Sequence, residues 1–268
     1  MIVGNEREDL IVAADLTIDE VLVLADTLGG IGDDFPHVLG IRKDNIPYEE
    51  IKRSVWGAVR QELTGKNILD SSGAVHEAVA KMLQIATRPE RTLECRWWRT
   101  DKKLIRFAVC RRGPDHVIIC RNDERIVSQF VAASAGLAGM VEAVIGRVAG
   151  ARMGPVTGPS TEIETAVMPE DLTQFGCDIK SAATLLTAIR ERTEWVHIVA
   201  TETLPGGTVV RPHPSAGILD SRHGRVVSLP KEVRHELHGT FLSGTPENLA
   251  RTLSELTGFL PSGSWENL

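Results

Sequence analysis

Residues 94–106 read ECRWWRTDKKLIR, and around this stretch the spacing of apolar residues changes from that of a helix to that of a strand. From Thr92 onward two sets of residues alternate: Leu93, Cys95 and Trp97 in one set, Glu94, Arg96 and Trp98 in the other. Alternation of this kind is typical of a β-strand, whose successive side chains point to opposite faces. The pattern therefore predicts that Trp97 lies in a core and that Trp98 lies on the opposite face.

Further strands follow the tryptophan pair closely. Ile105, Phe107 and Val109 alternate with Arg106, Ala108 and Cys110, and two more strands are expected near 116–121 and 124–131. The sequences RGPD at 112–115 and ND at 122–123 are typical of turns. Because these connections are too short to hold a crossover helix, the region is predicted to be an antiparallel meander.

Helices are predicted on the N-terminal side of the meander. Residues 17–20, TIDE, form a Thr-x-x-Glu capping box at the start of a helix that ends at Gly29–Gly30. A second helix begins after Pro47 and ends at Gly65, and its expected buried side carries Ile51, Val55, Val59 and Leu63. A third helix is expected over 73–86, a short strand over 9–14, and an Ala/Gly-rich helix over 132–148.

The second half of the chain repeats this order. Residues 149–169, rich in proline and hydroxyl side chains, are predicted to be a linker. A helix over about 170–191 precedes strands near 194–202, 207–211, 215–220, 224–229 and 236–243, and a last helix starts at Thr245-Pro246-Glu247. We therefore expect one domain over 1–268 with two related halves, 1–150 and 165–268, and a structural duplication is a hypothesis.

Composition is that of an ordinary globular protein. The 268 residues are 42% hydrophobic and 25% charged, with a net charge of −6, and no apolar run approaches the roughly 18 residues of a membrane span. The four cysteines lack paired spacing, and the N-terminus does not resemble a secretory signal, so we expect reduced thiols in a cytoplasmic protein. The segment Arg91–Arg125 is an exception in charge, with ten Lys/Arg against five Asp/Glu.

No catalytic, metal or cofactor motif stands out. Residues 235–238, HELH, place two histidines three apart instead of the four that a helical zinc motif requires, and the thiols of Cys95, Cys110 and Cys120 are too widely spaced for a zinc site. The glycines of GGIGDD follow a helix instead of a strand, which argues against a phosphate loop. The sequence therefore predicts neither an enzyme nor a cofactor.

Residues 47–111 have an order of elements that also fits a winged helix-turn-helix, with RTDKK at 99–103 as the tip of the wing. Such a protein would be a DNA-binding regulator. The candidate recognition helix, AVHEAVAKMLQIA, carries one lysine and no arginine, whereas phosphate contacts need clustered cations. This function remains the alternative to a protein-binding role.

Trp98 itself has two interpretations. It could pack under a neighbouring helix or stack on an arginine of a solvated face. It could instead anchor another protein, because tryptophan and arginine are enriched among the residues that dominate binding energy at interfaces.

Several stretches share a pattern of apolar, glycine and capping residues: LTIDEVLVLADTLGG followed by FPHVLGI, VRQELTGKNILDSSGAVHEAVAKMLQIATRPE, GRVVSLP and GTPENLARTLSEL. In these stretches the chain resembles the EspG family, the cytosolic chaperones of actinobacterial type VII secretion. This resemblance implies an α+β fold of two related halves, with a central antiparallel β-sheet and flanking helices that include a C-terminal helical bundle. It also implies a non-enzymatic protein that binds the apolar tip of a PPE protein within a PE–PPE heterodimer, with no nucleic acid, membrane or cofactor as a partner. The oligomeric state is left open.

The resemblance further implies where the client binds. In the family the sheet and the loop between its second and third strands form much of the binding surface, and this loop corresponds here to Arg99–Lys103, which is shorter than in many members. We therefore expect an aromatic anchor with a cationic rim that steers acidic clients. The expected client-binding residues are Arg96, Trp98, Arg99, Thr100, Asp101, Lys102 and Lys103.

Overall fold

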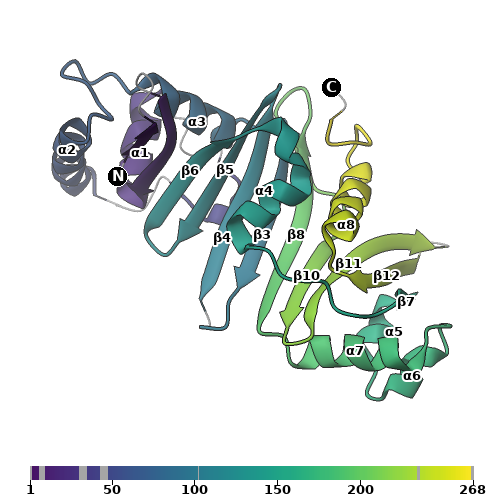
Figure 1. The fold of residues 1–268 in the computed structure, drawn as a ribbon. Helices are drawn as coiled ribbons and strands as arrows, with labels where there is room; N and C mark the ends of the chain where they lie inside the picture. Colours follow the sequence, from purple (N-terminus) through teal and green to yellow (C-terminus); the bar gives the residue numbers. More distant parts are fainter. Residues whose placement is uncertain are drawn as a thin grey trace. The chain divides into compact units, whose positions relative to one another are not determined.

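A computed structural model describes residues 2–5, 10–29, 35–42, 48–101, 103–233 and 236–266. The chain forms two compact units (Figure 1). Unit 1 comprises Met1–Glu94 and Ile105–Ala133, and unit 2 comprises Cys95–Leu104 and Ser134–Leu268. Each unit is described by itself, and the tryptophan pair belongs to unit 2.

The strands of unit 1 follow the order β1-β2-β6-β5-β4 and all pair antiparallel. They are β1 (Ile2–Asn5), β2 (Leu10–Thr17), β4 (Leu104–Arg112), β5 (Asp115–Asn122) and β6 (Arg125–Val131). Strand β3 (Arg91–Trp98) follows β4 in this order and enters unit 2 after Glu94. The predicted meander is confirmed, because turns of two residues each join β4 to β5 and β5 to β6.

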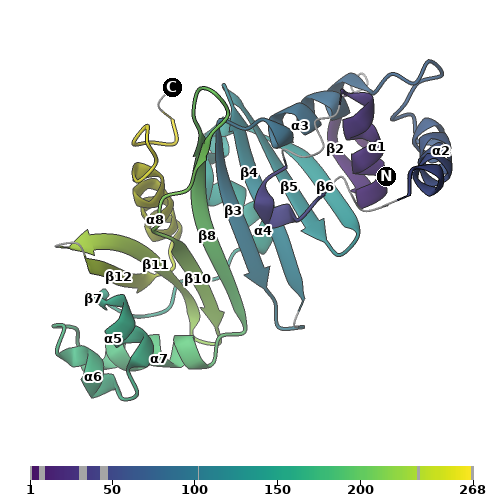
Figure 2. The same ribbon diagram turned by 180° about the vertical axis from the view of Figure 1, so that it is seen from behind.

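Three α-helices of unit 1 bury apolar faces: α1 (Ile18–Thr27), α2 (Glu49–Gly65) and α3 (Glu77–Thr87). At the start of α1 the capping box is confirmed, since the Glu20 N–H donates to Thr17 Oγ1 and the Thr17 N–H donates to Glu20 Oε2. Helix α3 packs against β2, β5 and β6 and buries Met82 and Leu83 completely (Figure 2).

Two expectations for these helices were wrong. Ile51 was expected on the buried side of α2 but is 54% exposed. The face of α2 that packs on α1 begins nearer the C-terminal end of the helix, where Leu63 is fully buried. Helix α3 begins at Glu77 instead of Gly73, because Asp70 Oδ1 accepts from the N–H groups of Ser72 and Ala74 and so closes a turn there. Gly73 has φ +85°, which suits that turn and not a helix.

The strands of unit 2 follow the order β3-β8-β10-β11-β12-β7. They are β8 (Glu194–Thr203), β10 (Ala216–Ser221), β11 (Gly224–Val233), β12 (Glu236–Ser243) and β7 (Val156–Pro159), and the short β9 (Val209–Val210) pairs with β8. From β8 to β7 every pair is antiparallel.

The helices of unit 2 form two groups. Helix α8 (Pro246–Gly258) packs on β8, β10 and β11 and against α4 (Gly136–Ile145), as Figure 1 shows. Its predicted start is confirmed, because Thr245 Oγ1 accepts from the Asn248 N–H and Pro246 occupies the first turn. The second group is α5 (Ser160–Thr165), α6 (Pro169–Thr173) and α7 (Ile179–Arg190).

The region between residues 149 and 191 differs from the sequence-based expectation. The stretch 149–169, expected to be a linker, contains β7 and α5. The single helix expected over 170–191 is divided into α6 and α7, because Gly176 has φ +85° and Asp178 caps a new helix by accepting from the Ser181 N–H. The pseudo-repeat of halves 1–150 and 165–268 stays a prediction.

The α+β fold class, with antiparallel strands and flanking helices, is confirmed. The winged-helix alternative over 47–111 is not supported, because the apolar face of α3 is buried against strands of unit 1 and leaves no recognition face of the expected kind. Among the described residues, no helix has both the length and the apolar character needed to cross a bilayer.

Candidate protein-binding surface

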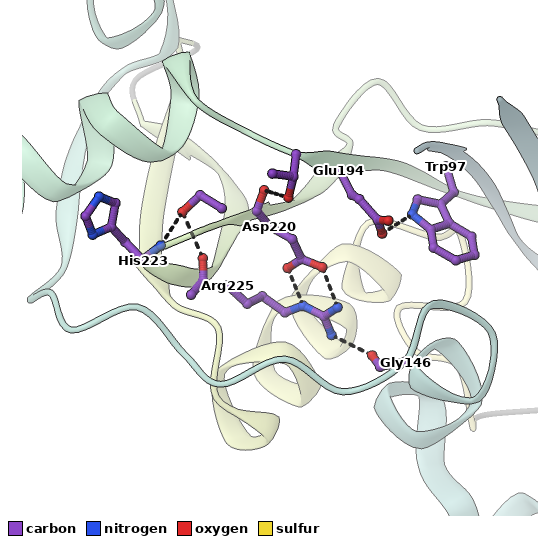
Figure 3. A network of polar contacts seen from close by, with 9 residues as sticks. Trp97, Gly146, Glu194, Asp220, His223 and Arg225 are labelled. Carbon is purple, nitrogen blue, oxygen red and sulfur yellow. Dashed lines mark hydrogen bonds and ion pairs between the residues drawn. The ribbon is translucent and has the colours of Figure 1, made fainter. Parts of the chain in front are cut away.

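Trp97 lies on the buried face of β3, as its alternation predicted. Its side chain is 9% exposed, and its Nε1–H donates a 2.9 Å hydrogen bond to Glu194 Oε2 at the start of β8 (Figure 3). The Arg99 guanidinium lies 5.1 Å from the Trp97 ring centroid, and its Nε is 3.9 Å from Glu194 Oε1. Arg99 is therefore on the same face as Trp97 and not on that of Trp98.

A buried ion pair fixes the strand next to Glu194. In the β8–β10 register Glu194 is opposite Asp220, and both Asp220 oxygens accept 2.7 Å hydrogen bonds from Arg225, at Nε and Nη2. Arg225 is fully buried and its Nη1 also donates to the Gly146 carbonyl at the end of α4, as Figure 3 shows. These bonds tie β10 and β11 to α4 and position the first residues of β8.

Trp98 stacks on a tryptophan from another strand. Its ring and that of Trp195 in β8 have centroids 4.3 Å apart and planes inclined by 13°. Both side chains are partly buried, and the Arg192 guanidinium lies 5.6 Å from the Trp195 centroid. The packing partner is thus a tryptophan instead of the helix or arginine expected for a structural role.

The stacked pair lies on the face of β3 and β8 opposite α4 and α8. Trp97 and Glu194 point toward the α4 side, so strand alternation directs Trp98 and Trp195 to the other side. In Figure 2 the ribbons of β3 and β8 face the viewer with no helix of unit 2 in front of them. A stacked aromatic pair on such a face offers a wide, flat and rigid contact surface.

The loop that follows β3 is held against the start of β8. The Arg99 N–H donates to the Lys103 carbonyl at 3.0 Å, and the Lys103 N–H donates to Asp101 Oδ1 at 3.1 Å. Thr100 Oγ1 donates to the Thr193 carbonyl at 3.2 Å. Lys102, the remaining predicted loop residue, lies outside the described residues.

Basic side chains lie on the face of the stacked pair and in the adjoining loop. Arg96 is partly buried on the Trp98 face, and Lys103 is exposed at the end of the loop. His197, two residues beyond Trp195, has its pKa lowered by burial and further by the positive charges of Arg96 and Arg211. An imidazole in this environment is uncharged at neutral pH.

Sequence reasoning found part of this surface. It identified Trp98 and the loop, which are local to one hairpin, but missed Trp195, His197 and Arg192. The residues EWVHI at 194–198 do alternate, so a local signal for a strand existed. Which strand would lie beside β3 could not be read from it, because the two tryptophans are almost a hundred positions apart.

Burial makes two of the thiols difficult to ionise. Burial raises the pKa of the Cys110 thiol, and it raises the pKa of the Cys120 thiol to about 11. Both thiols are therefore protonated at neutral pH and poor nucleophiles. Within the described ranges, no three side chains of the metal-binding types gather at one point.

Comparison with known proteins identifies the family. The sequence profile of the EspG family matches residues 17–255, so the chain belongs to the EspG family. The "ESX-1 secretion-associated protein EspG1" of Mycobacterium marinum is 45% identical over 259 residues, which cover 96% of this chain and 92% of that protein. The protein of the same description from Mycobacterium tuberculosis is also 45% identical, over 96% of this chain and 90% of its own length.

A more distant relative and one solved structure are also similar to this chain. The "ESX-3 secretion-associated protein EspG3" of Mycolicibacterium smegmatis is 29% identical over 94% of this chain and 89% of its own length. The solved structure of "the Mycobacterium tuberculosis type VII secretion system chaperone EspG5 in complex with PE25-PPE41 dimer" aligns with a TM-score of 0.73, covering 95% of this chain and 99% of that chain. At 18% identity this likeness shows the fold alone.

Proposed function

We propose that this protein is a non-enzymatic cytosolic chaperone that binds a PE–PPE-type heterodimer and keeps it soluble for type VII secretion. Membership of the EspG family and the similar fold of a chaperone whose structure was solved in complex with a PE25-PPE41 dimer support the proposal. The observation that carries it on this chain is the stacked pair of Trp98 and Trp195 on a face of β3 and β8 that no helix of unit 2 covers (Figure 2).

We further propose that the client contacts the face around this pair. Of the predicted residues, the contact would comprise Arg96, Trp98, Thr100, Asp101, Lys102 and Lys103, joined by Trp195 and Arg192. Arg99 is left out of it, because its guanidinium lies on the Trp97 face. A client with an exposed apolar tip needs a flat apolar area with a polar rim. The two indole rings would supply the centre, and Arg96, Arg192 and Lys103 the rim.

A second apolar area of unit 2 lies near the end of α7. Val167 and Met168, between α5 and α6, are 62% and 56% exposed. They are held beside that end, because Arg190 donates to the Val167 carbonyl, and Arg192, which lies over Trp195, follows two residues later. Exposed apolar side chains that lie together are typical of an interaction surface. The helices α5–α7 would thus extend the contact beyond the sheet.

Calorimetry with a purified PE–PPE heterodimer tests both proposals. Trp98→Ala combined with Lys102→Glu and Lys103→Glu should weaken binding by at least about 2 kcal/mol, as expected when an interface hot spot is lost. Arg147→Glu combined with Arg251→Glu, exposed cations following α4 and on α8, provides a control for charge reversal outside this surface.

The possible outcomes test the chaperone function and the assigned binding surface separately. If the wild-type protein does not bind the heterodimer, the chaperone function is contradicted. If it binds and the Trp98 variant binds equally well, the function stands and the assigned surface is wrong. A circular-dichroism melt of each variant establishes that any loss of binding is not a loss of folding.

A further inference from the structure

Unit 2 contains a cavity that the client surface does not use. It has a volume of about 550 Å³ and lies between the segment 148–152, helix α7 and the turn that joins β10 to β11. Four basic side chains line it: Arg152, Lys180, Arg222 and His223. We call this cavity the basic groove. Its positive charge contrasts with the net charge of −6 of the whole chain.

Most acidic groups near the basic groove are already engaged. Glu191 pairs with Arg222 at 3.0 Å, and Asp178 accepts from the N–H and Oγ of Ser181. Asp220 is held by the buried Arg225. Within the part of the chain that the structure describes, Arg152 and Lys180 make no ion pair or side-chain hydrogen bond. The groove therefore has unbalanced positive charge exposed to solvent.

The position of Lys180 has no local structural reason. It is the second residue of α7, where the aligned peptide dipoles disfavour a cation. The α7 side chains that stabilise unit 2, such as Leu185 and Leu186, lie on the buried face, whereas Lys180 and Thr184 line the groove. A lysine that opposes the helix dipole and faces a basic cavity is better explained by binding than by folding.

The backbone beneath the groove is rigid. The Ala151 N–H donates to the Arg225 carbonyl at 2.9 Å, and the Arg225 N–H donates to the Ala149 carbonyl at 2.8 Å. Gly224, with φ +109°, approaches this segment so closely that a Cβ there would lie 2.6 Å from the Ala149 oxygen. The turn next to Arg225 is further closed by Ser221, whose Oγ accepts from the N–H of His223, a residue labelled in Figure 3.

We propose that the basic groove binds an acidic peptide segment of a protein partner, at a site separate from the client surface. The cations come from three separate segments of the chain that border the cavity, which suits carboxylates spaced along a peptide. A compact anion would instead need donors that converge on one point. Val148, 37% exposed on the groove, offers an apolar contact for a side chain between the carboxylates.

The test uses the full chain and a fluorescein-labelled peptide of alternating Glu and Leu, with a Gln/Leu peptide as its uncharged match. Fluorescence anisotropy at low salt should show binding of the Glu/Leu peptide alone, and added salt should weaken it. Arg152→Glu combined with Lys180→Glu should weaken binding at least about tenfold, because it reverses two rim charges. Arg147→Glu with Arg251→Glu, which changes the net charge equally, should leave it within about twofold.

Several results would overturn the proposal. The proposal is wrong if the wild-type protein does not bind the Glu/Leu peptide at protein concentrations up to about 1 mM. It is also wrong if the groove variant and the control variant lose affinity for the peptide equally. Displacement of the peptide by inorganic phosphate, but not by chloride at equal ionic strength, would indicate a site for a compact anion. If Trp98→Ala abolishes binding of the peptide, the peptide binds at the client surface. If Trp98→Ala leaves peptide binding unchanged, the basic groove and the client surface are separate sites.

Discussion

At the scale of single residues, two neighbouring tryptophans have different surroundings because strand geometry sends them to opposite faces. Trp97 is buried and hydrogen-bonded to Glu194, while Trp98 is partly buried against Trp195. Burial and hydrogen bonding stabilise the fold through Trp97. Stacking of two partly exposed rings contributes less to folding and leaves a surface that a partner can cover.

We therefore expect Trp97→Ala to lower the free energy of unfolding by about 3–5 kcal/mol, as a truncation in a core does. Trp98→Ala should lower it by about 1 kcal/mol, the value of one aromatic pair. Denaturant unfolding of both variants in parallel measures the difference. Equal losses would mean that the two faces of β3 do not differ in burial as described.

His197, on the same face as Trp195, should make the stability of the protein depend on pH. Burial and two nearby arginines lower its pKa, so the folded protein binds a proton there less readily than the unfolded chain does. The part of the free energy of unfolding that requires a neutral His197 imidazole is fully present above the ordinary histidine pKa, about 6.5. It is lost as the pH falls below that value. We expect the melting temperature of His197→Gln to decline less than that of the wild type between about pH 7.5 and 5.5. Parallel curves for both proteins would be incompatible with this linkage.

At the scale of elements, the hairpin of β10 and β11 depends on one buried ion pair. Arg225→Met would leave the Asp220 carboxylate buried without its partner, and removal of one member of a buried pair costs about 3–5 kcal/mol. Arg222→Met, on the same turn but exposed, should change stability by less than about 0.5 kcal/mol. Urea unfolding compares the two. A small effect of Arg225→Met would show that water replaces the guanidinium.

Elements whose signals are local could be predicted from the sequence. The capping box of Thr17 and Glu20 and the Thr245 cap of α8 each involve residues within three positions, and both helices start where these residues predict. The break between α6 and α7 was missed because a glycine such as Gly176 can also occur inside a helix. Only the cap that Asp178 provides for the next helix shows that the chain breaks there. β7 was missed because its pairing with β12 joins residues about eighty positions apart.

At the scale of the whole molecule, the candidate surface depends on such a distant pairing. The hydrogen bond from Trp97 to Glu194 spans 97 positions, and no local pattern near either residue indicates the other. Sequence reasoning could therefore place Trp98 on an open face and a cationic loop beside it. It could not identify Trp195 as the residue whose ring stacks on that of Trp98. It also could not show that Arg99 lies on the buried face.

Charge distribution over the molecule leads to a kinetic prediction. Ten basic against five acidic residues between Arg91 and Arg125, in a chain of net charge −6, should steer an acidic client toward the hairpin. Rim charges act mainly on the association rate, whereas a central anchor acts mainly on the dissociation rate. Lys103→Glu should thus slow association and reduce its dependence on salt, and Trp98→Ala should speed dissociation.

Surface plasmon resonance with an immobilised PE–PPE heterodimer, at salt concentrations from about 50 to about 300 mM, separates these two rates. The control is Arg251→Glu, which alters the net charge as Lys103→Glu does but lies on α8, so its association rate should stay close to that of the wild type. If both reversals slow association equally, steering comes from net charge and the basic hairpin has no special part in it. If Trp98→Ala changes only the association rate, the stacked pair does not anchor the client, and its contribution is confined to the fold.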